Sequence, residues 1–434
     1  MDTSNLIFTI ILVVSLSFFS YNLWKIVRNI RLGKSINRFD NPLQRTKILL
    51  KIAFGQTKLF ARPVSGILHA LVYWGFLVIT IGTLEMMIDG VFNLERSLGV
   101  LGVFYDIATA SGDIMAVLVL VSCLIFMFRR LVVNIKRFSG KEMTKSSSID
   151  AIVALCIIVF LMISLLTMNM GYIGVHQGDV VGSYPISNLL MPFLASWDIH
   201  SIYLFHEVSW WTHILLVLIF LNELPYSKHF HVVMSIPNVY FSNIENLGKM
   251  NNLSSVTNEV KLMLDPNADP YATPPPQTDN NIQAFGAQDV KDLNWVQLMN
   301  AYSCTECGRC TSECPANQTG KLLSPRKIMM DTRKRLKEVG NNIDKHGKDY
   351  NDNKTLLNDY ISPEELWACT TCNACTQACP LNIDPLSIII DLRRYLVMEQ
   401  SAAPQELNMM FTNIENNGAP WQFSQSDRLN WKDE

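Results

Sequence analysis

Two cysteine motifs organise this chain, and they read Cys304-Thr-Glu-Cys307-Gly-Arg-Cys310-Thr-Ser-Glu-Cys314-Pro315 and Cys369-Thr-Thr-Cys372-Asn-Ala-Cys375-Thr-Gln-Ala-Cys379-Pro380. Both have the spacing C-x2-C-x2-C-x3-C-P, which is the bacterial ferredoxin pattern for 4Fe–4S clusters. Three thiolates at this spacing can wrap a loop around one cluster, while the proline turns the chain at the fourth cysteine. The motifs therefore predict two 4Fe–4S clusters.

The fourth cysteine of each motif is expected to ligate the cluster of the other motif, as in two-cluster ferredoxins. Cluster I would then take Cys304, Cys307, Cys310 and Cys379, and cluster II would take Cys369, Cys372, Cys375 and Cys314. Disulfides suit such tightly spaced thiols less well than metal does. Zinc would need only the C-x2-C pairs and would leave the other cysteines of each motif unexplained. The two remaining cysteines lie in apolar runs and are expected to be core residues: Cys123 and Cys156.

Composition divides the chain into two parts. It has 434 residues with 49% hydrophobic content, enough for at least two domains, and its net charge of −2 gives no basic field for nucleic acid. Nearly all long apolar runs precede residue 226, whereas the later part is polar and carries both motifs. We therefore expect an all-α protein with a membrane domain at 1–235, a surface helix and linker at 236–284, a two-cluster domain at 285–400 and a tail at 401–434.

Five stretches are long and apolar enough to cross a bilayer, which takes roughly 20 residues. The third is the weakest of them because Asp106 and Asp113 lie in its first turns. The first has no basic residue before it and no cleavage site after it, so we expect it to remain attached rather than to act as a signal peptide. The predicted spans are 6–24, 64–88, 107–128, 149–170 and 202–224.

Basic residues predict the orientation of these spans. Ten lysines and arginines lie at 25–62, between the first two spans, and six lie at 129–145, between the third and fourth. The opposite loops contain Arg96 alone. Because basic loops stay in the cytoplasm, the amino terminus is expected outside and the two-cluster domain inside. The basic loops are interpreted as orientation signals in contact with lipid headgroups, not as a nucleic-acid site.

The polar part reads as mostly helical. Residues 236–264 are expected to form a helix along the membrane surface, and the proline-rich stretch 265–276 an extended linker. Residues 326–339 look helical, and Ser362-Pro363 is typical of a helix start. Nothing in this part alternates as a strand does, which favours a helical cluster domain over a small β-rich ferredoxin. The tail beyond 402 has little pattern.

Histidines in the apolar part are candidate haem ligands, because polar groups at bilayer depth are costly. His69 lies near the cytoplasmic end of the second span and His231 follows the fifth. If the fifth helix continues past Pro225 with a kink, His213 and His231 lie five turns apart on one face. We expect one haem b between His69 and His231, with His213 and His206 as further candidates and a second haem left open. Hydrogen bonding between helices is the alternative role for these histidines.

The apolar part resembles the cytochrome b subunit family of respiratory nitrate reductase, the γ subunit. The resemblance rests on five spans, a histidine in the second span, Trp-Thr-His213, and Pro225-Tyr-Ser-Lys-His-Phe-His231. It implies that His69 and His231 bind a haem on the cytoplasmic side and that His213 serves an outer haem. The second histidine of the family's second span would fall at Ile79 here.

The fused arrangement resembles membrane iron–sulfur proteins related to heterodisulfide reductase, and especially the electron-transfer-flavoprotein:menaquinone oxidoreductase group. The stretch Pro315-Ala-Asn-Gln-Thr-Gly320-Lys-Leu-Leu-Ser-Pro325-Arg-Lys is similar to that group's sequence after its first motif. The resemblance implies a bacterial plasma membrane protein. Those proteins continue into cysteine-rich CCG domains, whereas this chain shows no Cys-Cys pair, so we expect a separate CCG subunit.

These features lead to a hypothesis of electron transfer from a cytoplasmic donor, such as electron-transfer flavoprotein, through two clusters and haem b to menaquinone. One alternative is a subunit that takes electrons from menaquinol to a thiol or disulfide substrate, and another is a non-catalytic redox anchor for a different dehydrogenase. No glycine-rich phosphate loop follows a strand, so the chain is not expected to hold flavin or nucleotide. Candidate proton carriers for the quinone are Glu85, Asp89, Glu207 and Glu223.

Overall fold

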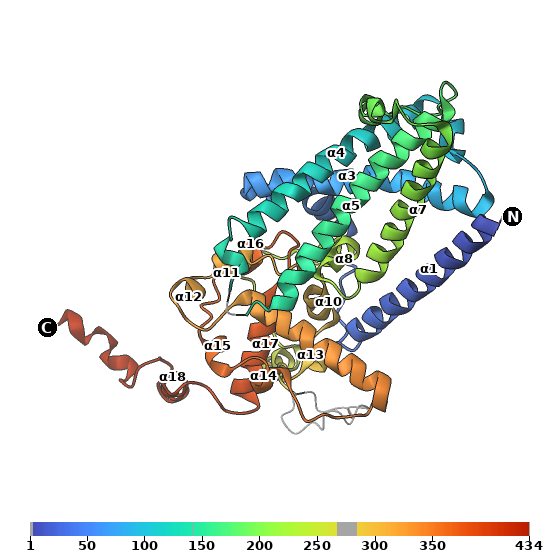
Figure 1. The fold of residues 1–434 in the computed structure, drawn as a ribbon. Helices are drawn as coiled ribbons and strands as arrows, with labels where there is room; N and C mark the ends of the chain where they lie inside the picture. Colours follow the sequence, from blue (N-terminus) through green and yellow to red (C-terminus); the bar gives the residue numbers. More distant parts are fainter. Residues whose placement is uncertain (1–2, 141, 267–283, 434) are drawn as a thin grey trace.

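The computed structural model describes residues 3–140, 142–266 and 284–433, and within these residues the chain is built from helices without a strand (Figure 1). The predicted all-α fold is therefore confirmed. Most of the proline-rich stretch lies at 267–283, outside the described residues, so the predicted linker stays a prediction.

Five helices of the described residues are long and apolar enough to cross a membrane, and each covers one predicted span, although the fifth stops one residue before the predicted end at 224. They otherwise extend beyond the predicted limits because the polar ends of a helix continue its backbone hydrogen bonds after the apolar run has stopped. The five are α1 (Thr3–Ile30), α3 (Pro63–Phe92), α4 (Val103–Leu131), α5 (Lys145–His176) and α7 (Ile199–Glu223).

The third predicted span was expected to be the weakest, but α4 is a full helix that accommodates Asp113. Asp113 is buried, and its carboxylate accepts hydrogen bonds from the backbone N–H of Ile186 at 2.7 Å and of Ser187 at 2.9 Å. These two residues lie in the first turn of the short helix α6 (Pro185–Leu189). The carboxylate thus satisfies donors that would otherwise be orphaned at a helix start.

The predicted continuation of the fifth span through His231 was also wrong. The α7 helix ends at Glu223, a 3-10 turn η6 (Lys228–Phe230) follows, and a separate helix α8 (His231–Tyr240) begins at the histidine itself. Pro225 falls in this break, where its ring cannot extend the helical ladder, and Ser227 Oγ accepts from His229 N at 3.1 Å to start the new turn. The five-turn register between His213 and His231 therefore does not exist.

The region 236–264 is not one surface helix as predicted. The α8 helix ends at Tyr240, and a loop separates it from α9 (Ser254–Leu264). Rather than standing alone, α8 packs against α10 (Trp295–Ser303) and α2 (Pro42–Leu49), and the predicted boundary at 235 falls inside it.

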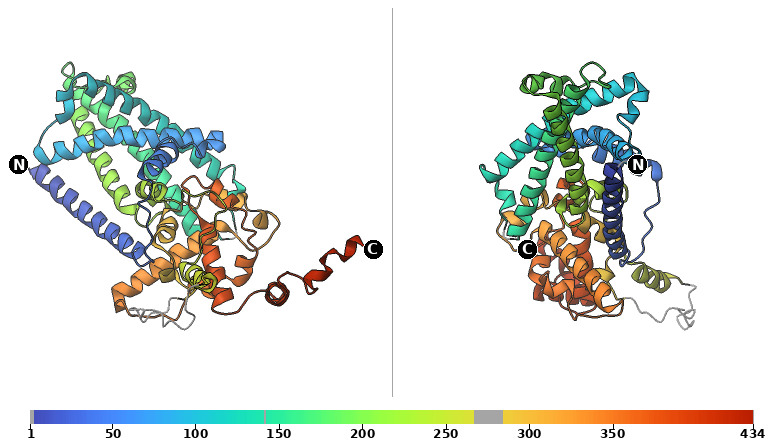
Figure 2. Two further views of the ribbon diagram at one scale, coloured as in Figure 1. Left: turned by 180° about the vertical axis from the view of Figure 1, so that it is seen from behind. Right: turned by 45° about the vertical axis from the view of Figure 1, so that its right-hand side comes forward.

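The cluster domain consists of short helices around two longer ones, with the predicted 326–339 helix inside α13. The expected helix start is confirmed, since Ser362 and Glu365 form a reciprocal capping box. A carboxy-terminal arm, containing α18 (Gln405–Asn417) and η8 (Gln425–Lys432), extends away from the body (Figures 1 and 2). The other elements are α11 (Arg309–Ser312), α12 (Pro315–Gln318), α13 (Pro325–His346), α14 (Leu356–Asp359), α15 (Pro363–Trp367), α16 (Ala374–Ala378) and α17 (Pro385–Met398).

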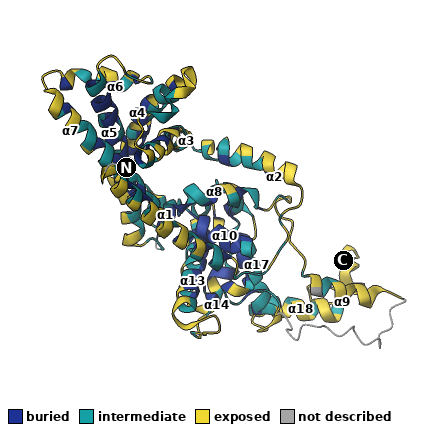
Figure 3. Cartoon of the chain, turned by 90° about the vertical axis from the view of Figure 1, so that its right-hand side faces the viewer, coloured by how far each residue is buried: buried dark blue, intermediate teal, exposed yellow. Residues whose placement is uncertain are grey.

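One end of the membrane half shares a hydrophobic cluster with the cluster domain. Ile30 at the end of α1 and Met234 in α8 belong to the same buried cluster as Leu298 and Leu392 of the cluster domain. Figure 3 shows this continuity as dark, buried segments where α8, α10 and α17 meet. Burial of apolar surface is the dominant favourable term in such packing, so the cluster domain is held firmly against one end of the helix bundle.

Candidate iron–sulfur and histidine sites

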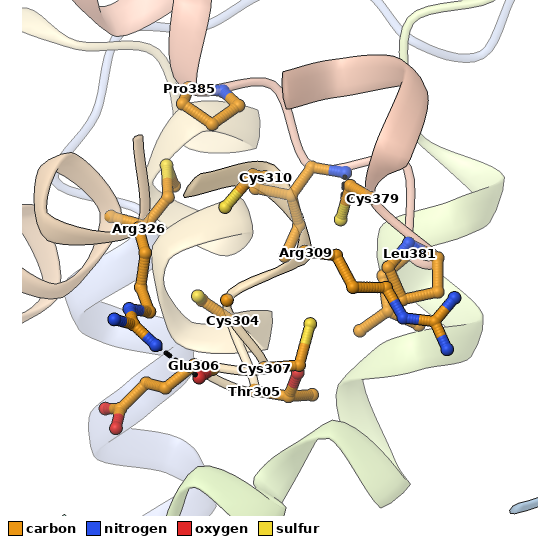
Figure 4. Close-up of a pocket in the computed structure, with 14 residues that line it drawn as sticks. Cys304, Thr305, Glu306, Cys307, Arg309, Cys310, Arg326, Cys379, Leu381 and Pro385 are labelled. Carbon is orange, nitrogen blue, oxygen red and sulfur yellow. Dashed lines mark hydrogen bonds between the residues drawn. The ribbon is translucent and has the colours of Figure 1, made fainter. Parts of the chain in front are cut away.

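The first four-cysteine pocket, called pocket I, is lined by the cysteines predicted for cluster I: Cys304, Cys307, Cys310 and Cys379. Its volume is ≈ 390 Å³, and Figure 4 shows the sulfur atoms turned toward a common space. Three of these cysteines lie between the end of α10 and the turn of α11, and the fourth follows α16.

The second pocket, called pocket II, has a volume of ≈ 320 Å³ and is lined by the other predicted set: Cys369, Cys372, Cys375 and Cys314. The structure thus groups the eight thiols with the fourth cysteine of each motif crossing to the other pocket. Ligation of iron by these thiols stays a prediction.

Two left-handed residues shape each motif loop. Glu306 and Gly308 have φ of 56° and 72°, and the equivalent Thr371 and Asn373 have φ of 54° and 60°. Residues other than glycine and asparagine rarely adopt this backbone conformation. Because it recurs at the same two positions of both motifs, we infer that the loop needs it to turn successive thiols to the same side.

Burial favours the protonated form of the thiols that line pocket I. Burial raises the pKa of Cys310 well above its ordinary value, and it raises the pKa of Cys304 to about 11 and that of Cys379 to about 12. Because metal binds the thiolate, loading the site must displace these protons. In the described part of the chain no three His, Cys, Asp or Glu side chains lie close enough to hold a single ion. The two pockets instead each bring four thiols to one space, which is the number of ligands that a 4Fe–4S cluster takes.

Pocket I lies against the loop that leads into α3. Arg309, from motif I, donates to the carbonyl oxygens of Lys58 at 3.2 Å and Leu59 at 3.5 Å. Lys58 Nζ in turn donates to the carbonyl oxygen of Cys379 at 3.3 Å. A few residues later in the same loop, Arg62 donates to a hydroxyl of α11. These reciprocal contacts bring the start of the α3 helix next to the cysteines of pocket I.

A buried arginine holds pocket I from a second side. Arg326 is 1% exposed, and its guanidinium donates to Glu142 Oε1 at 2.7 Å and to the carbonyl oxygens of Arg137 at 2.6 Å and Glu306 at 3.5 Å. Arg137 and Glu142 belong to the loop between α4 and α5. Figure 4 shows the Arg326–Glu306 bond beside the cysteines. The ion pair therefore joins the membrane half to the motif loop.

Pocket II has no comparable cover from the described residues. Thr370, Thr371 and Cys372 are exposed. Arg393 of α17 donates to the carbonyl oxygens of Leu366 and Cys369 from within the domain. The motif II loop is consequently the face of the cluster domain that a protein in solution can approach.

His69 and His231 lie side by side although the predicted helix register was wrong. Their ring centroids are 6.3 Å apart, and one comes from α3 and the other from the first residue of α8. Two metal–nitrogen bonds of about 2 Å each would separate the coordinating nitrogens by about 4 Å, and adding the rings brings the centroids to about 6 Å apart. The spacing therefore fits a bis-histidine metal site.

The second nitrogen of each of these rings already has an oxygen partner. His69 Nδ1 lies 3.1 Å from Gln56 Oε1, and His231 Nδ1 lies 3.3 Å from the carbonyl oxygen of Lys228. Such acceptors hold the proton on Nδ1 and leave the Nε2 lone pair for a metal. His229 is also 6.2 Å from His231, but both rings come from one turn, which does not place them on opposite faces of a macrocycle.

The other two candidate histidines have no histidine partner among the described residues. His213 Nδ1 contacts the carbonyl oxygen of Leu161 at 3.1 Å and Ser164 Oγ at 3.0 Å, and His206 Nδ1 contacts the carbonyl oxygen of Met168 at 3.1 Å. Both thus make hydrogen bonds between α7 and α5. That is the alternative role that the sequence left open for them.

The candidate proton carriers differ in their surroundings. Glu85 is 1% exposed, so it is not a solvated helix-end residue, and its carboxylate accepts from Tyr105 Oη at 2.9 Å and from Leu98 N at 3.0 Å. Asp89 accepts from the backbone N–H of Ser97. Glu207 and Glu223 are each only partly buried.

Sequence reasoning missed the polar residues that connect the two halves, above all Arg309, Arg326, Glu142 and Gln56. A charged residue inside a metal motif, as Arg309 is, was the one available signal. Arg326 and Glu142 lie 184 residues apart. Gln56 lies 13 residues before His69 and outside the helix that holds it, so no local spacing could have indicated these contacts.

Comparison with known proteins supports an iron–sulfur domain in this chain. Residues 303–383 match the family model described as a 4Fe-4S dicluster domain. The chain is 29% identical, over 99% of its length, to the probable iron-sulfur-binding oxidoreductase FadF of Bacillus subtilis, and 26% identical, over 98%, to EtfAB:quinone oxidoreductase of Syntrophomonas wolfei. It covers 61% and 59% of those two proteins, so it spans about three fifths of their length.

A shorter stretch is similar to a different relative, which belongs to the ferredoxin/F(420)H(2)-dependent CoB-CoM heterodisulfide reductase of Methanosarcina acetivorans. The chain is 33% identical to one subunit of that enzyme over 120 residues, which make up 27% of this chain and 60% of the other. No solved structure matches the chain.

The fold and the two pockets define a class, namely a membrane iron–sulfur protein with a two-cluster domain at the end of a five-helix bundle. The expected relation to heterodisulfide-reductase-related iron–sulfur proteins is confirmed, because the chain is related to FadF, EtfAB:quinone oxidoreductase and the heterodisulfide reductase subunits. The resemblance of the apolar part to the nitrate reductase γ subunit stays a prediction.

Proposed function

We propose that this chain is the membrane electron-transfer subunit of a quinone oxidoreductase, and that it carries electrons from a cytoplasmic donor to menaquinone. Pocket I and pocket II would each hold a 4Fe–4S cluster, and His69 and His231 would hold a haem b. When bound, these groups supply successive one-electron carriers. The name of one relative, EtfAB:quinone oxidoreductase, favours electron-transfer flavoprotein as the donor, acting through a CCG-type subunit.

One observation carries the proposal. Arg309 of motif I bonds the Lys58–Leu59 backbone, and the same loop continues into α3, which holds His69 in its second turn. The cysteines of pocket I thus lie next to the segment that leads into α3 and positions His69. This contact supports a path between the two sites.

The packing also supports an order in which the two clusters would receive electrons. The motif II loop is exposed and lies within the cluster domain, whereas the motif I loop is covered by the membrane half. A donor in solution would therefore reach pocket II first, and pocket I would stand between pocket II and the histidine pair. The basic residues at 25–62 and 129–145 support a cytoplasmic cluster domain in a bacterial plasma membrane, with the amino terminus outside.

The similarity to a heterodisulfide reductase subunit favours a second candidate, in which the same sites carry electrons from menaquinol toward a thiol or disulfide substrate. A redox anchor for another dehydrogenase would use the same residues. Reduction of the purified protein by menaquinol, as opposed to reduction by a reduced flavoprotein, separates these directions.

The testing experiment compares His69→Ala with His200→Ala, a histidine at the exposed start of α7. We expect anaerobically purified wild-type protein to contain about eight iron atoms outside haem. His69→Ala should lose the haem b absorption and keep that iron, while His200→Ala should keep both. A haem spectrum unchanged in His69→Ala would refute the ligand assignment, and zinc in place of iron would refute the relay.

A further inference from the structure

A pocket inside the helix bundle has no part in the relay described so far. This bundle pocket, of ≈ 570 Å³, lies between α3, α4, α5 and α7, toward the end farthest from the cluster domain. Its walls are mostly apolar, with Val78 and Ile79 of α3 facing Leu165 and Met168 of α5. A mostly apolar lining with a few polar groups is typical of sites for small organic ligands.

His213 gives the bundle pocket a polar group that can change its role. The side chain lines the pocket and is 1% exposed, and Nδ1 is satisfied by the Leu161 carbonyl and the Ser164 hydroxyl. If Nδ1 donates to the carbonyl, Nε2 is an acceptor, and if Nδ1 accepts from the hydroxyl, Nε2 is a donor. No described residue is hydrogen-bonded to Nε2, so this nitrogen can donate to or accept from a ligand in the pocket.

The opposite wall does not complete a bis-histidine haem site. Of the described residues that line the bundle pocket, His213 is the one histidine, and Ile79 of α3 lines it too. An isoleucine cannot ligate iron. The lining therefore does not supply a bis-histidine pair, and it offers a ligand apolar contact and hydrogen bonds, with His213 Nε2 as one polar anchor.

The far end of the bundle pocket carries charged side chains that are paired with neighbouring polar groups. Glu85 accepts from Tyr105 and Leu98, Arg96 Nη1 lies 3.8 Å from Glu85 Oε2, and the Arg96 guanidinium stacks on the ring of Tyr172 at 4.4 Å. These contacts hold a fixed set of polar groups at one end of an otherwise apolar chamber. An elongated ligand with oxygen atoms at opposite ends matches this distribution.

The pocket also opens sideways. Gly82 of α3 and Gly112 of α4 both line it, Gly82 is exposed on the surface of the bundle, and a Cβ built at either position meets no atom within 4 Å. Because α3 and α4 are candidate membrane spans, the exposed surface at Gly82 would face the bilayer. The ligand can thus arrive from the lipid.

We infer that the bundle pocket binds the quinone ring, an inference that rests on the proposed function. One quinone oxygen bonds His213 Nε2 and the other faces the end with Glu85 and Arg96. Reduction adds two electrons, delivered singly by the relay, and two protons from water at that end of the bundle, and it converts both carbonyls to hydroxyls. His213 donates to the carbonyl of the quinone and accepts from the hydroxyl of the quinol, which is the exchange that its two Nδ1 partners allow.

The test measures binding directly, with the fluorescent quinone-site probe 2-heptyl-4-hydroxyquinoline N-oxide titrated into the purified full chain. Gly82→Leu should block the opening, and His213→Leu should remove the anchor. Each should weaken probe binding by about tenfold or more. The control is Phe76→Leu, on the lipid-exposed face of the same helix, which should bind as the wild type does.

Iron and haem contents of the same preparations separate the two proposals. Failure of the proposed function appears in the wild type, as missing iron or haem. The quinone-site inference is overturned if iron and haem are normal and Gly82→Leu binds the probe unchanged, or if the wild type binds none. Loss of a second haem in His213→Leu would overturn it as well, since that haem would occupy the pocket.

Discussion

Pocket I and pocket II are built from the same motif yet are held in different ways. The motif I loop is contacted from both sides by the membrane half, through Arg309 on the loop before α3 and Arg326 on the loop before α5. The motif II loop is bonded by Arg393 from its own domain, and Cys372 is exposed. Identical local sequence patterns thus acquire different surroundings from what packs around them, and in the proposed electron path they would take different positions.

The largest expected effect comes from removing one cysteine of each set. Cys307→Ala and Cys372→Ala should each lose about four iron atoms. The cluster that remains should then differ in access, because pocket II is open to solvent and pocket I is covered. Reduced methyl viologen, mixed anaerobically in a stopped-flow instrument, should reduce the remaining cluster several-fold faster in Cys307→Ala. Equal rates would remove the distinction between an outer and an inner cluster.

The next effect concerns the arginines that hold the two loops. Arg326→Leu leaves Glu142 buried without its partner, and breaking such a pair costs about 3–5 kcal/mol. Arg393→Leu removes hydrogen bonds to two carbonyl oxygens and should cost about 1–2 kcal/mol. Thermal unfolding followed by loss of the cluster absorption measures both. If Arg393→Leu is the more damaging, the view that the membrane half holds pocket I is wrong.

The smallest effect exchanges the left-handed residues of the two motifs. A Cβ at Gly308 would lie 2.7 Å from Arg326 Nη1 and 2.8 Å from the carbonyl oxygen of Arg137, so Gly308→Asn should cost about 1–3 kcal/mol by overpacking. Asn373→Gly adds no atoms and should cost under about 1 kcal/mol. Urea titration of cluster absorption compares the two variants. Equal tolerance at both positions would show that the membrane half does not crowd motif I.

In the membrane half, a correct prediction about two histidines rested on an incorrect helix. The sequence predicted that His69 and His231 lie together, but it did so through a continuous helix that Pro225 interrupts. Their depth in the membrane was readable from the apolar runs, because span length follows bilayer thickness. The angle at which α8 leaves α7 was not readable, since it depends on packing against α10 and α2.

Sequence alone determined the grouping of the eight cysteines and the number of membrane helices. Both follow from short-range rules, since ligand spacing reflects the size of a cluster and an apolar run reflects the thickness of a bilayer. Only the tertiary structure decided which pocket faces the membrane, and which residues line the bundle pocket. The physical reason is distance along the chain: Arg326 and Glu142 are 184 residues apart, and no local period encodes a contact that forms only when two folded surfaces meet.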